Sequence, residues 1–280
     1  MSRRSGQMLV ITLWMIGIVS LAVGAVTTWS THEMRLSRFP LEALQREAIA
    51  QAAVAQAIAV LTRDEAVADH LQEPWATGDE AGQPVLSNIL VGSGVFTAEL
   101  LDEQRKVHLN TSTEEVLRRL IEAVNVPGVN VRQIAEAIID WRTASNPETG
   151  VCAGQNPPCH DGPLASVDEL RLVPGMTPEL FDALAPYVTV YPLAGAPVNI
   201  NTAPAIVLDA LNCPGGGDDL VAQREAAAPP VLDPSACAGT GTQSTIFTVS
   251  VEAIVPPSSL TTRVRAVIDR NGHILAWLPQ

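Results

Sequence analysis

The sequence has few aromatic residues and few basic ones. Aromatic residues make up 4% of its 280 residues, and 17 Lys and Arg stand against 30 Asp and Glu, so the formal net charge is -13. A chain this acidic repels phosphate backbones, and the basic stretch at Arg118-Arg119 is only two residues long. The composition therefore argues against nucleic acid as a partner.

The sequence also lacks a recognisable catalytic constellation. It contains no G-x-S-x-G, no H-E-x-x-H and no phosphate-binding glycine loop. Carboxylates are plentiful, but most fall on predicted helix faces, where solvation is the simplest explanation. We predict that the chain is not an enzyme and carries no cofactor. The histidines are scattered, with no two at metal-ligand spacing: His32, His70, His108, His160 and His273.

Cysteine is scarce, and all four cysteines lie in the second half of the chain, at Cys152, Cys159, Cys213 and Cys237. An even number of cysteines behind an export segment predicts two disulfides in an oxidising compartment. We favour the pairs Cys152–Cys159 and Cys213–Cys237, although four cysteines allow three connectivities. The alternative is a zinc site that includes Cys152, Cys159 and His160, but a closed site needs four ligands and thiolates that survive oxidation.

One long apolar run lies near the N-terminus, over residues 8–26. About 20 such residues in a helix span a bilayer core, and Arg3 and Arg4 before the run favour a cytoplasmic N-terminus. We predict a single transmembrane helix over residues 7–29, with the remainder of the chain on the far side of the membrane. The alternative is a secretory signal cut near Ala25 that releases a soluble binding module. N-terminal sequencing separates the two, because the mature chain would begin at Gln7 in one case and at Val26 in the other.

The helix is predicted to continue through residues 30–65. Residues 41–61 are rich in alanine and other strong helix formers, but Pro40 should kink or interrupt the helix because it lacks an N–H. One face of this segment is apolar and could pack on partner subunits or on the chain's own sheet. Its apolar positions include Ile49, Ala53, Ala57 and Val60.

The extreme N-terminus resembles the leader of prepilins, a short basic segment that ends in Gly6 directly before the apolar run. The resemblance implies cleavage between Gly6 and Gln7 by a prepilin peptidase, with methylation of the new amine. The fifth residue of the mature chain is then Ile11, where most pilin-like subunits carry glutamate. Because a carboxylate in lipid is costly without a partner, its absence suggests a subunit with no neighbour above it.

The remaining sequence predicts strands on both sides of a helical insert. Helix-start signals occur at Ser112 with Glu115, at Asn130, at Ser166 with Glu169, at Thr177-Pro178 and before residues 203–211. Strands, then helices, then strands indicate an α+β fold. The expected strands are 85–91 and 95–101 around a glycine turn, a short one near 106–109, and 244–255, 260–270 and 273–278, the last two joined by Asn271-Gly272.

Several segments resemble the type II secretion protein K family. They are EPWA (73–76), VHLNTS (107–112), AIIDWR (137–142), SVDELRLVPGMTPELFDALAPYVTVYP (166–192) and VNINTAPAIVLDAL (198–211). The resemblance implies a pilin-like long N-terminal helix on an antiparallel sheet, with a large inserted all-α domain of two SAM-like units. We expect a leader over 1–6, the membrane helix and its continuation, sheet segments over 66–109 and 244–280, and the insert over 110–243.

The resemblance also implies a function. Members of this family are minor pseudopilins at the tip of the pseudopilus, where they initiate assembly and support protein export across the outer membrane. The implied partners are the minor pseudopilins of types I and J, the major pseudopilin, the prepilin peptidase and the inner-membrane secretion platform.

Calcium is a further implication of the resemblance, because family members can hold it after the Asp-Trp motif. Here Thr143 and Ser145 stand where carboxylates are expected, and calcium needs six to eight oxygens. The disulfide Cys152–Cys159 could order this loop in place of a metal. The weak calcium candidates are Asp140, Asn146, Glu148 and Asp161.

Two Asn-Thr segments, at Asn110-Thr111 and at Asn201-Thr202, resemble helix-hairpin-helix DNA-binding modules. The region has no interleaved Lys and Arg, and helix capping accounts for both segments. DNA binding is therefore the less favoured alternative, and a salt-dependent gel shift would detect it.

Overall fold

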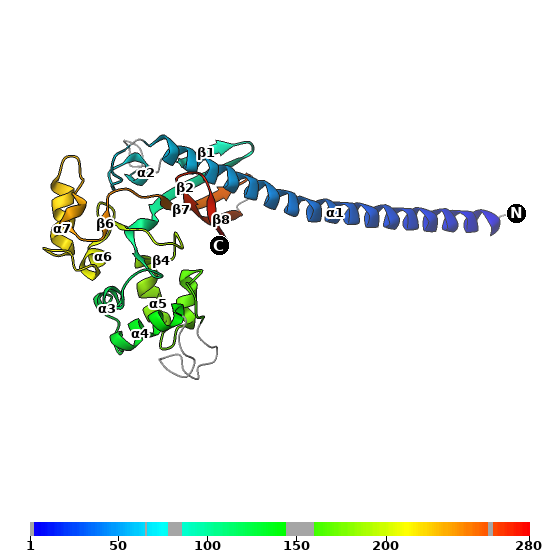
Figure 1. Ribbon diagram of the computed structural model, residues 1–280. Helices are drawn as coiled ribbons and strands as arrows, with labels where there is room; N and C mark the ends of the chain where they lie inside the picture. Colours follow the sequence, from blue (N-terminus) through cyan, green and yellow to red (C-terminus); the bar gives the residue numbers. More distant parts are fainter. Residues whose placement is uncertain (1–2, 65, 78–85, 144–159, 257–259) are drawn as a thin grey trace.

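The structure is a computed structural model that describes residues 3–64, 66–77, 86–143, 160–256 and 260–280. Its first element is α1 (Arg3–Arg63), a helix of 61 residues. Figure 1 shows α1 as one gently curved rod whose N-terminal part extends far from the rest of the chain. The helix is not interrupted at Pro40, because the strong helix formers that follow it outweigh the cost of the hydrogen bond that proline cannot make.

A sheet of five strands, all paired antiparallel in the order β1-β2-β7-β8-β9, supports the C-terminal half of α1. The turn of Gly92, with φ +58, joins the first two strands, and Gly272, with φ +92, lies between the last two. The strands expected before and after the insert are confirmed. They are β1 (Leu86–Val91), β2 (Gly94–Asp102), β7 (Ile246–Ile254), β8 (Thr261–Asp269) and β9 (Ile274–Pro279).

Small residues let α1 lie close to this sheet. Ala50, Ala53 and Ala57 are fully buried there. A Cβ on Gly94 would come within 2.2 Å of Ile49 Cδ1 and 2.7 Å of a strand carbonyl, so only glycine fits. The apolar face predicted for residues 41–61 therefore packs on the chain's own sheet. Its buried positions are not available to partner subunits.

The helical insert lies beside the sheet (Figure 1). Its short strands form two parallel pairs, β3 with β4 and β5 with β6, so the strand expected near 106–109 pairs within the insert and the insert is not entirely helical. The elements are β3 (Val107–His108), α3 (Glu114–Ala123), α4 (Val131–Arg142), α5 (Pro178–Leu184), β4 (Val188–Thr189), β5 (Val198–Asn199), α6 (Ala205–Ala210), α7 (Gly217–Ala226) and β6 (Thr240–Gly241), with 3-10 helices at Glu103–Arg105, Val167–Leu172, Ala185–Tyr187 and Pro234–Ala236. The remaining helix, α2 (Pro74–Thr77), precedes the sheet.

Helix caps were predicted correctly where the signal is local. Asn130 and Thr177 cap α4 and α5, and their side chains accept from the N–H groups of Gln133 and Leu180. The capping box at Ser112 is wrong, because the Ser112 N–H bonds to His108 in the preceding turn. Thr113 caps α3 instead, one residue later.

The sequence analysis missed α7. Two glycines with φ near +88 precede it, and a Cβ on Gly217 would lie 2.1 Å from the carbonyl oxygen of Ala205, so α7 starts directly against α6. Charged residues on α7 hide its helical periodicity.

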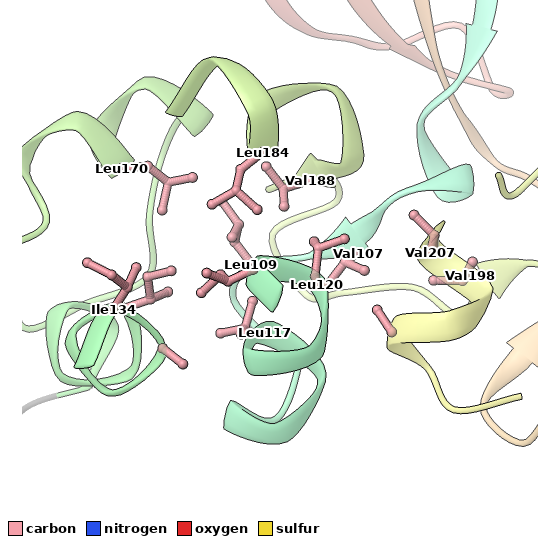
Figure 2. Packing of buried hydrophobic residues seen from close by; sticks show 14 of the residues in the cluster. Val107, Leu109, Leu117, Leu120, Ile134, Leu170, Leu184, Val188, Val198 and Val207 are labelled. Atoms are coloured by element: carbon pink, nitrogen blue, oxygen red, sulfur yellow. The ribbon is translucent and has the colours of Figure 1, made fainter. Parts of the chain in front are cut away.

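One buried cluster forms the core of the insert. Figure 2 shows Leu117 and Leu120 of α3 among side chains from the neighbouring helices, with Leu184 above and Val207 of α6 to one side. The buried residues of the early and late parts of the insert belong to this single cluster, so the insert packs as a continuous body.

Candidate assembly site: the membrane helix and the domain junction

The N-terminal part of α1 is apolar and unpacked. Over Val10–Thr27 the mean hydropathy is 2.2, and none of this segment is buried by the rest of the chain. By length and composition this is the single helix among the described residues that could cross a membrane. It lies inside the predicted span of 7–29.

The predicted processing residues lie at the start of this helix. Gly6 and Gln7 belong to α1, and the exposure of these two residues is outside the described part of the structure. Ile11 is 56% exposed and belongs to the apolar surface of the helix. Within the described residues, Ile11 does not belong to either buried cluster.

A buried carboxylate links the sheet to the insert. Asp102, at the end of β2, is 1% exposed. Its Oδ2 accepts from Thr202 Oγ1, from Ser244 Oγ at 2.7 Å and from Asn199 Nδ2 at 3.4 Å. Its Oδ1 accepts from the Gln104 N–H at 2.7 Å. Asp102 stands where the chain enters the insert. Its bonds to Thr202, inside the insert, and to Ser244, where the chain leaves it, connect these three points.

A second carboxylate, Asp69, joins the segment after α1 to the same junction. It is 2% exposed, accepts from the Ser244 N–H, and is paired with the Arg270 guanidinium. Arg270 also pairs with Asp64 at 3.2 Å and donates to the Ser244 carbonyl at 3.1 Å. Arg270 therefore ties α1, the exit from the insert and the end of β8 together.

Further side chains complete the junction. Gln104 accepts from the N–H and hydroxyl of Thr245 and donates to the carbonyls of Pro197 and Gln243. Glu103, beside it, accepts from Lys106 at 2.6 Å and from Thr248 at 2.6 Å. These residues bond across the start and end of the insert, so the two bodies are held in one relative orientation.

Burial changes the acidity of these groups. Burial raises the pKa of Asp102 to about 6, although the hydroxyls of Ser244 and Thr202 favour the charged form. Burial also raises the pKa of Asp69. Burial acts in the same direction at Glu103, but the charge of Lys106 and the hydrogen bonds from Lys106 and Thr248 together outweigh it, so the pKa is lowered. The prediction that most carboxylates are solvated is wrong for this group, whose partners lie far away in the sequence.

The EPWA segment packs against the base of the sheet. Trp75 is 6% exposed, donates from Nε1 to Glu73 at 2.8 Å, and meets the Phe247 ring edge-on at 5.3 Å. The three carboxylates of Asp64, Asp69 and Glu73 lie close together, but Arg270, Trp75 and the His70 N–H supply donors to them. Internal pairing thus accounts for this acidic cluster.

The Asn-Thr segments are structural bridges, which corrects the interpretation that they cap helices. Asn110 makes a two-way bond with the backbone of Leu164, at 2.8 and 2.9 Å. Asn199 and Thr202 bond to Asp102, and Pro204 rather than Asn201 or Thr202 stands at the N-cap of α6. Their amide and hydroxyl groups are directed inward, where they satisfy buried partners.

The structure joins Cys213 and Cys237 in a disulfide, with a Cα–Cα distance of 4.9 Å. Cys152 and Cys159 lie outside the described residues, as do Asn146 and Glu148 of the calcium candidates. Asp140 at the end of α4 and Asp161 are described, and Asp161 adopts φ +53. Calcium binding in this loop stays a prediction.

Comparisons with known proteins point to one family. The model of the family "Type II secretion system (T2SS), protein K" matches residues 91–193. The type II secretion system protein K of Klebsiella pneumoniae is 26% identical over 224 residues, which cover 71% of this chain and 67% of that protein.

A solved structure shares the fold. A chain in the crystal structure of the GspK-GspI-GspJ complex from the type 2 secretion system of enterotoxigenic Escherichia coli matches with a TM-score of 0.67 and 21% identity, over 87% of this chain and 99% of that one. The chain is therefore similar in sequence to type II secretion system protein K, and it shares the fold of a chain in the GspK-GspI-GspJ complex.

Proposed function

We propose that the chain is a single-pass inner-membrane protein whose periplasmic domain tops the pseudopilus, starts its assembly and supports protein export across the outer membrane. The observation that carries this proposal is the division of α1. Its apolar segment Val10–Thr27 is fully exposed, whereas its C-terminal part is buried on the sheet. The first suits a lipid environment, and the second fixes the domain to its anchor.

Processing is part of the proposal. A peptidase would cut between Gly6 and Gln7, and the mature chain would then carry Ile11 at its fifth position. In lipid, an N-terminal ammonium on one subunit and a carboxylate on its neighbour stabilise each other only as a pair. Because Ile11 supplies no carboxylate, the chain is suited to the first position of a filament.

The shape of the periplasmic part supports the same position. The insert lies beside the sheet and away from the membrane segment of α1 (Figure 1). The buried bonds around Asp102 and Asp69 hold it there. A subunit inside a regular shaft has neighbours above and below it, and a rigid insert of this size would collide with them. At the end of the filament it has free space.

A surface on α1 suits packing by sibling subunits. Leu41 is 57% exposed and Leu44 69% exposed, and both lie between the membrane segment and the part of α1 that the sheet covers. The related Escherichia coli chain was crystallised in a GspK-GspI-GspJ complex. We infer that minor pseudopilins of types I and J pack their own helices here. By resemblance, the major pseudopilin, the prepilin peptidase and the inner-membrane platform are further partners.

The test is co-purification of the full chain from detergent-solubilised membranes. The wild-type protein should bring the I-type and J-type subunits with it, and replacement of Leu41 and Leu44 by lysine should reduce their recovery by about tenfold or more, as expected when an apolar contact is lost and charge is placed in it. Leu193→Lys is the matched control, since Leu193 is 62% exposed on the insert. Failure of the wild-type chain to recover either subunit would contradict the proposal.

A further inference from the structure

A pocket of about 360 Å³ lies where the insert meets the segment that follows α1. Its walls come from Leu71, Gln72, Asn201, Arg224, Glu225 and Pro230. Figure 1 shows α7, which carries Arg224, at the end of the molecule farthest from the N-terminal end of α1. The pocket thus belongs to the distal part of the protein.

One wall residue has an unused donor. Asn201 is fully buried, and its Oδ1 accepts from the Leu232 N–H at 2.7 Å. That bond fixes which end of the amide is the nitrogen. Its Nδ2 has no hydrogen-bond partner in the part of the chain that the structure describes. A buried donor without a partner is costly and rare, so its presence in a pocket wall points to an acceptor that enters the pocket.

The second wall residue is a buried cation. Arg224 is 5% exposed, and its Nη1 donates to the carbonyls of Ile200 and Ala203, both at 2.9 Å. Both partners are neutral, and among the described residues no carboxylate lies within ion-pair distance of this guanidinium. Buried arginines are usually paired with an anion.

Nearby charges leave the Arg224 guanidinium only partly balanced. Burial lowers its pKa, Glu225 on the adjacent wall acts in the opposite direction, and Arg105 repels it further. Arg105 is a partly buried cation outside the pocket wall; burial lowers its pKa, and the nearby Asp102 and Glu103 act in the opposite direction. The pocket wall therefore combines an unpaired amide donor with one buried guanidinium.

We propose that this pocket binds a carboxylate group, which accepts from Asn201 Nδ2 and offsets the charge of Arg224. A carboxylate is the planar anion that matches an amide donor beside a guanidinium. Two sources present this chemistry on a polypeptide, the free C-terminus of a chain and the side chain of Asp or Glu. The carboxylate site is argued from the pocket alone and does not rest on the proposed function. Which protein supplies the carboxylate does rest on it: at the tip of a pseudopilus this end of the molecule would face exported proteins.

The test is titration of the full chain in detergent with acetate, with binding monitored by NMR or calorimetry. Acetate should bind saturably, while acetamide, which has the same shape and no charge, should bind at least about tenfold more weakly. Three short peptides separate the sources: one with a free C-terminus, the same peptide amidated, and an amidated peptide with one internal glutamate. Binding by the first alone assigns a C-terminus, and binding by the third assigns a side chain.

Variants locate the site. Asn201→Asp keeps the acceptor for Leu232 and places a carboxylate beside Arg224, so it should abolish acetate binding. Gln72→Glu places a carboxylate on the exposed wall of the pocket and serves if the first variant folds poorly. Glu225→Gln should strengthen binding about two- to fivefold, and Asp219→Asn, exposed on α7 outside the pocket, should leave it unchanged. Absence of saturable acetate binding to the wild type, or binding that persists in both Asn201→Asp and Gln72→Glu, overturns the proposal.

Discussion

At the scale of single residues, Asp102 decides how the insert is attached. It is a fully buried carboxylate that accepts hydrogen bonds from a strand end, the middle of the insert and the exit segment. A buried charge is stable only when such donors surround it. The hydrogen bonds of Asp102 make the attachment rigid. Burial of the charged carboxylate costs free energy, and this cost partly offsets the stabilisation from the hydrogen bonds.

That balance predicts a dependence of stability on pH. Burial raises the pKa of Asp102 to about 6 in the folded chain, above its unfolded value of 3.8, so the folded state binds the proton more tightly. The stability gained from this proton is complete below about pH 4 and is lost as the pH rises through 6, about 3 kcal/mol in all. Asp102→Asn should remove this contribution from the pH profile of the free energy of unfolding.

The measurement is chemical denaturation of the full chain in detergent between pH 4 and pH 7.5. The difference between the wild type and Asp102→Asn should decrease steadily as pH rises. Asp219→Asn, an exposed replacement on α7, should keep the wild-type profile. Parallel profiles for wild type and Asp102→Asn would rule out the assignment.

At the scale of elements, the contact of α1 with the sheet depends on small side chains. Ala53 is fully buried, and Gly94 on the sheet has no room for a Cβ beside Ile49 of α1. Extra methylene groups in such a contact force displacement of the backbone or unfavourable rotamers. The close approach of helix and sheet, rather than helix propensity, therefore sets how firmly the anchor is joined to the domain.

Ala53→Leu should accordingly lower the free energy of unfolding by about 1–3 kcal/mol, although leucine is also a good helix former. Ala55→Leu is the matched control on the exposed side of α1 and should change it by less than about 0.5 kcal/mol. Denaturant midpoints of the isolated protein provide the comparison. Equal effects of the two substitutions would show that packing on the sheet is not the cause.

At the scale of the whole molecule, the proposed function places this chain first in a filament, because of the bulk of its insert and because Ile11 supplies no carboxylate. Overproduction of the major pseudopilin should give long fibres that carry this protein at one end. Overproduction of this protein should give more and shorter fibres, because each copy can start one. Immunogold labelling distributed evenly along the fibres would refute the terminal position.

Much of the fold could be predicted because its signals are local. The apolar run needs only composition, the caps at Asn130 and Thr177 act on N–H groups three residues away, and the hairpin at Gly272 follows from its own backbone. No local signal of this kind marks α7. The glycines at its start are not typical helix formers, and its many charged residues hide the spacing of its apolar ones. Resemblance to a family supplied the function, which residue patterns alone did not.

By itself the sequence determined the apolar segment that could span a membrane, the alternation of strands and helices, and the separation of an insert from a sheet. Only the tertiary structure decided that Asp102 faces Thr202 and that Asp69 faces Arg270, across 100 and 201 positions. A local pattern cannot tell a solvated carboxylate from a buried one, because the donors that make burial tolerable come from distant segments brought together by folding. The unpaired amide of Asn201 became visible for the same reason, since its surroundings exist only in the folded chain.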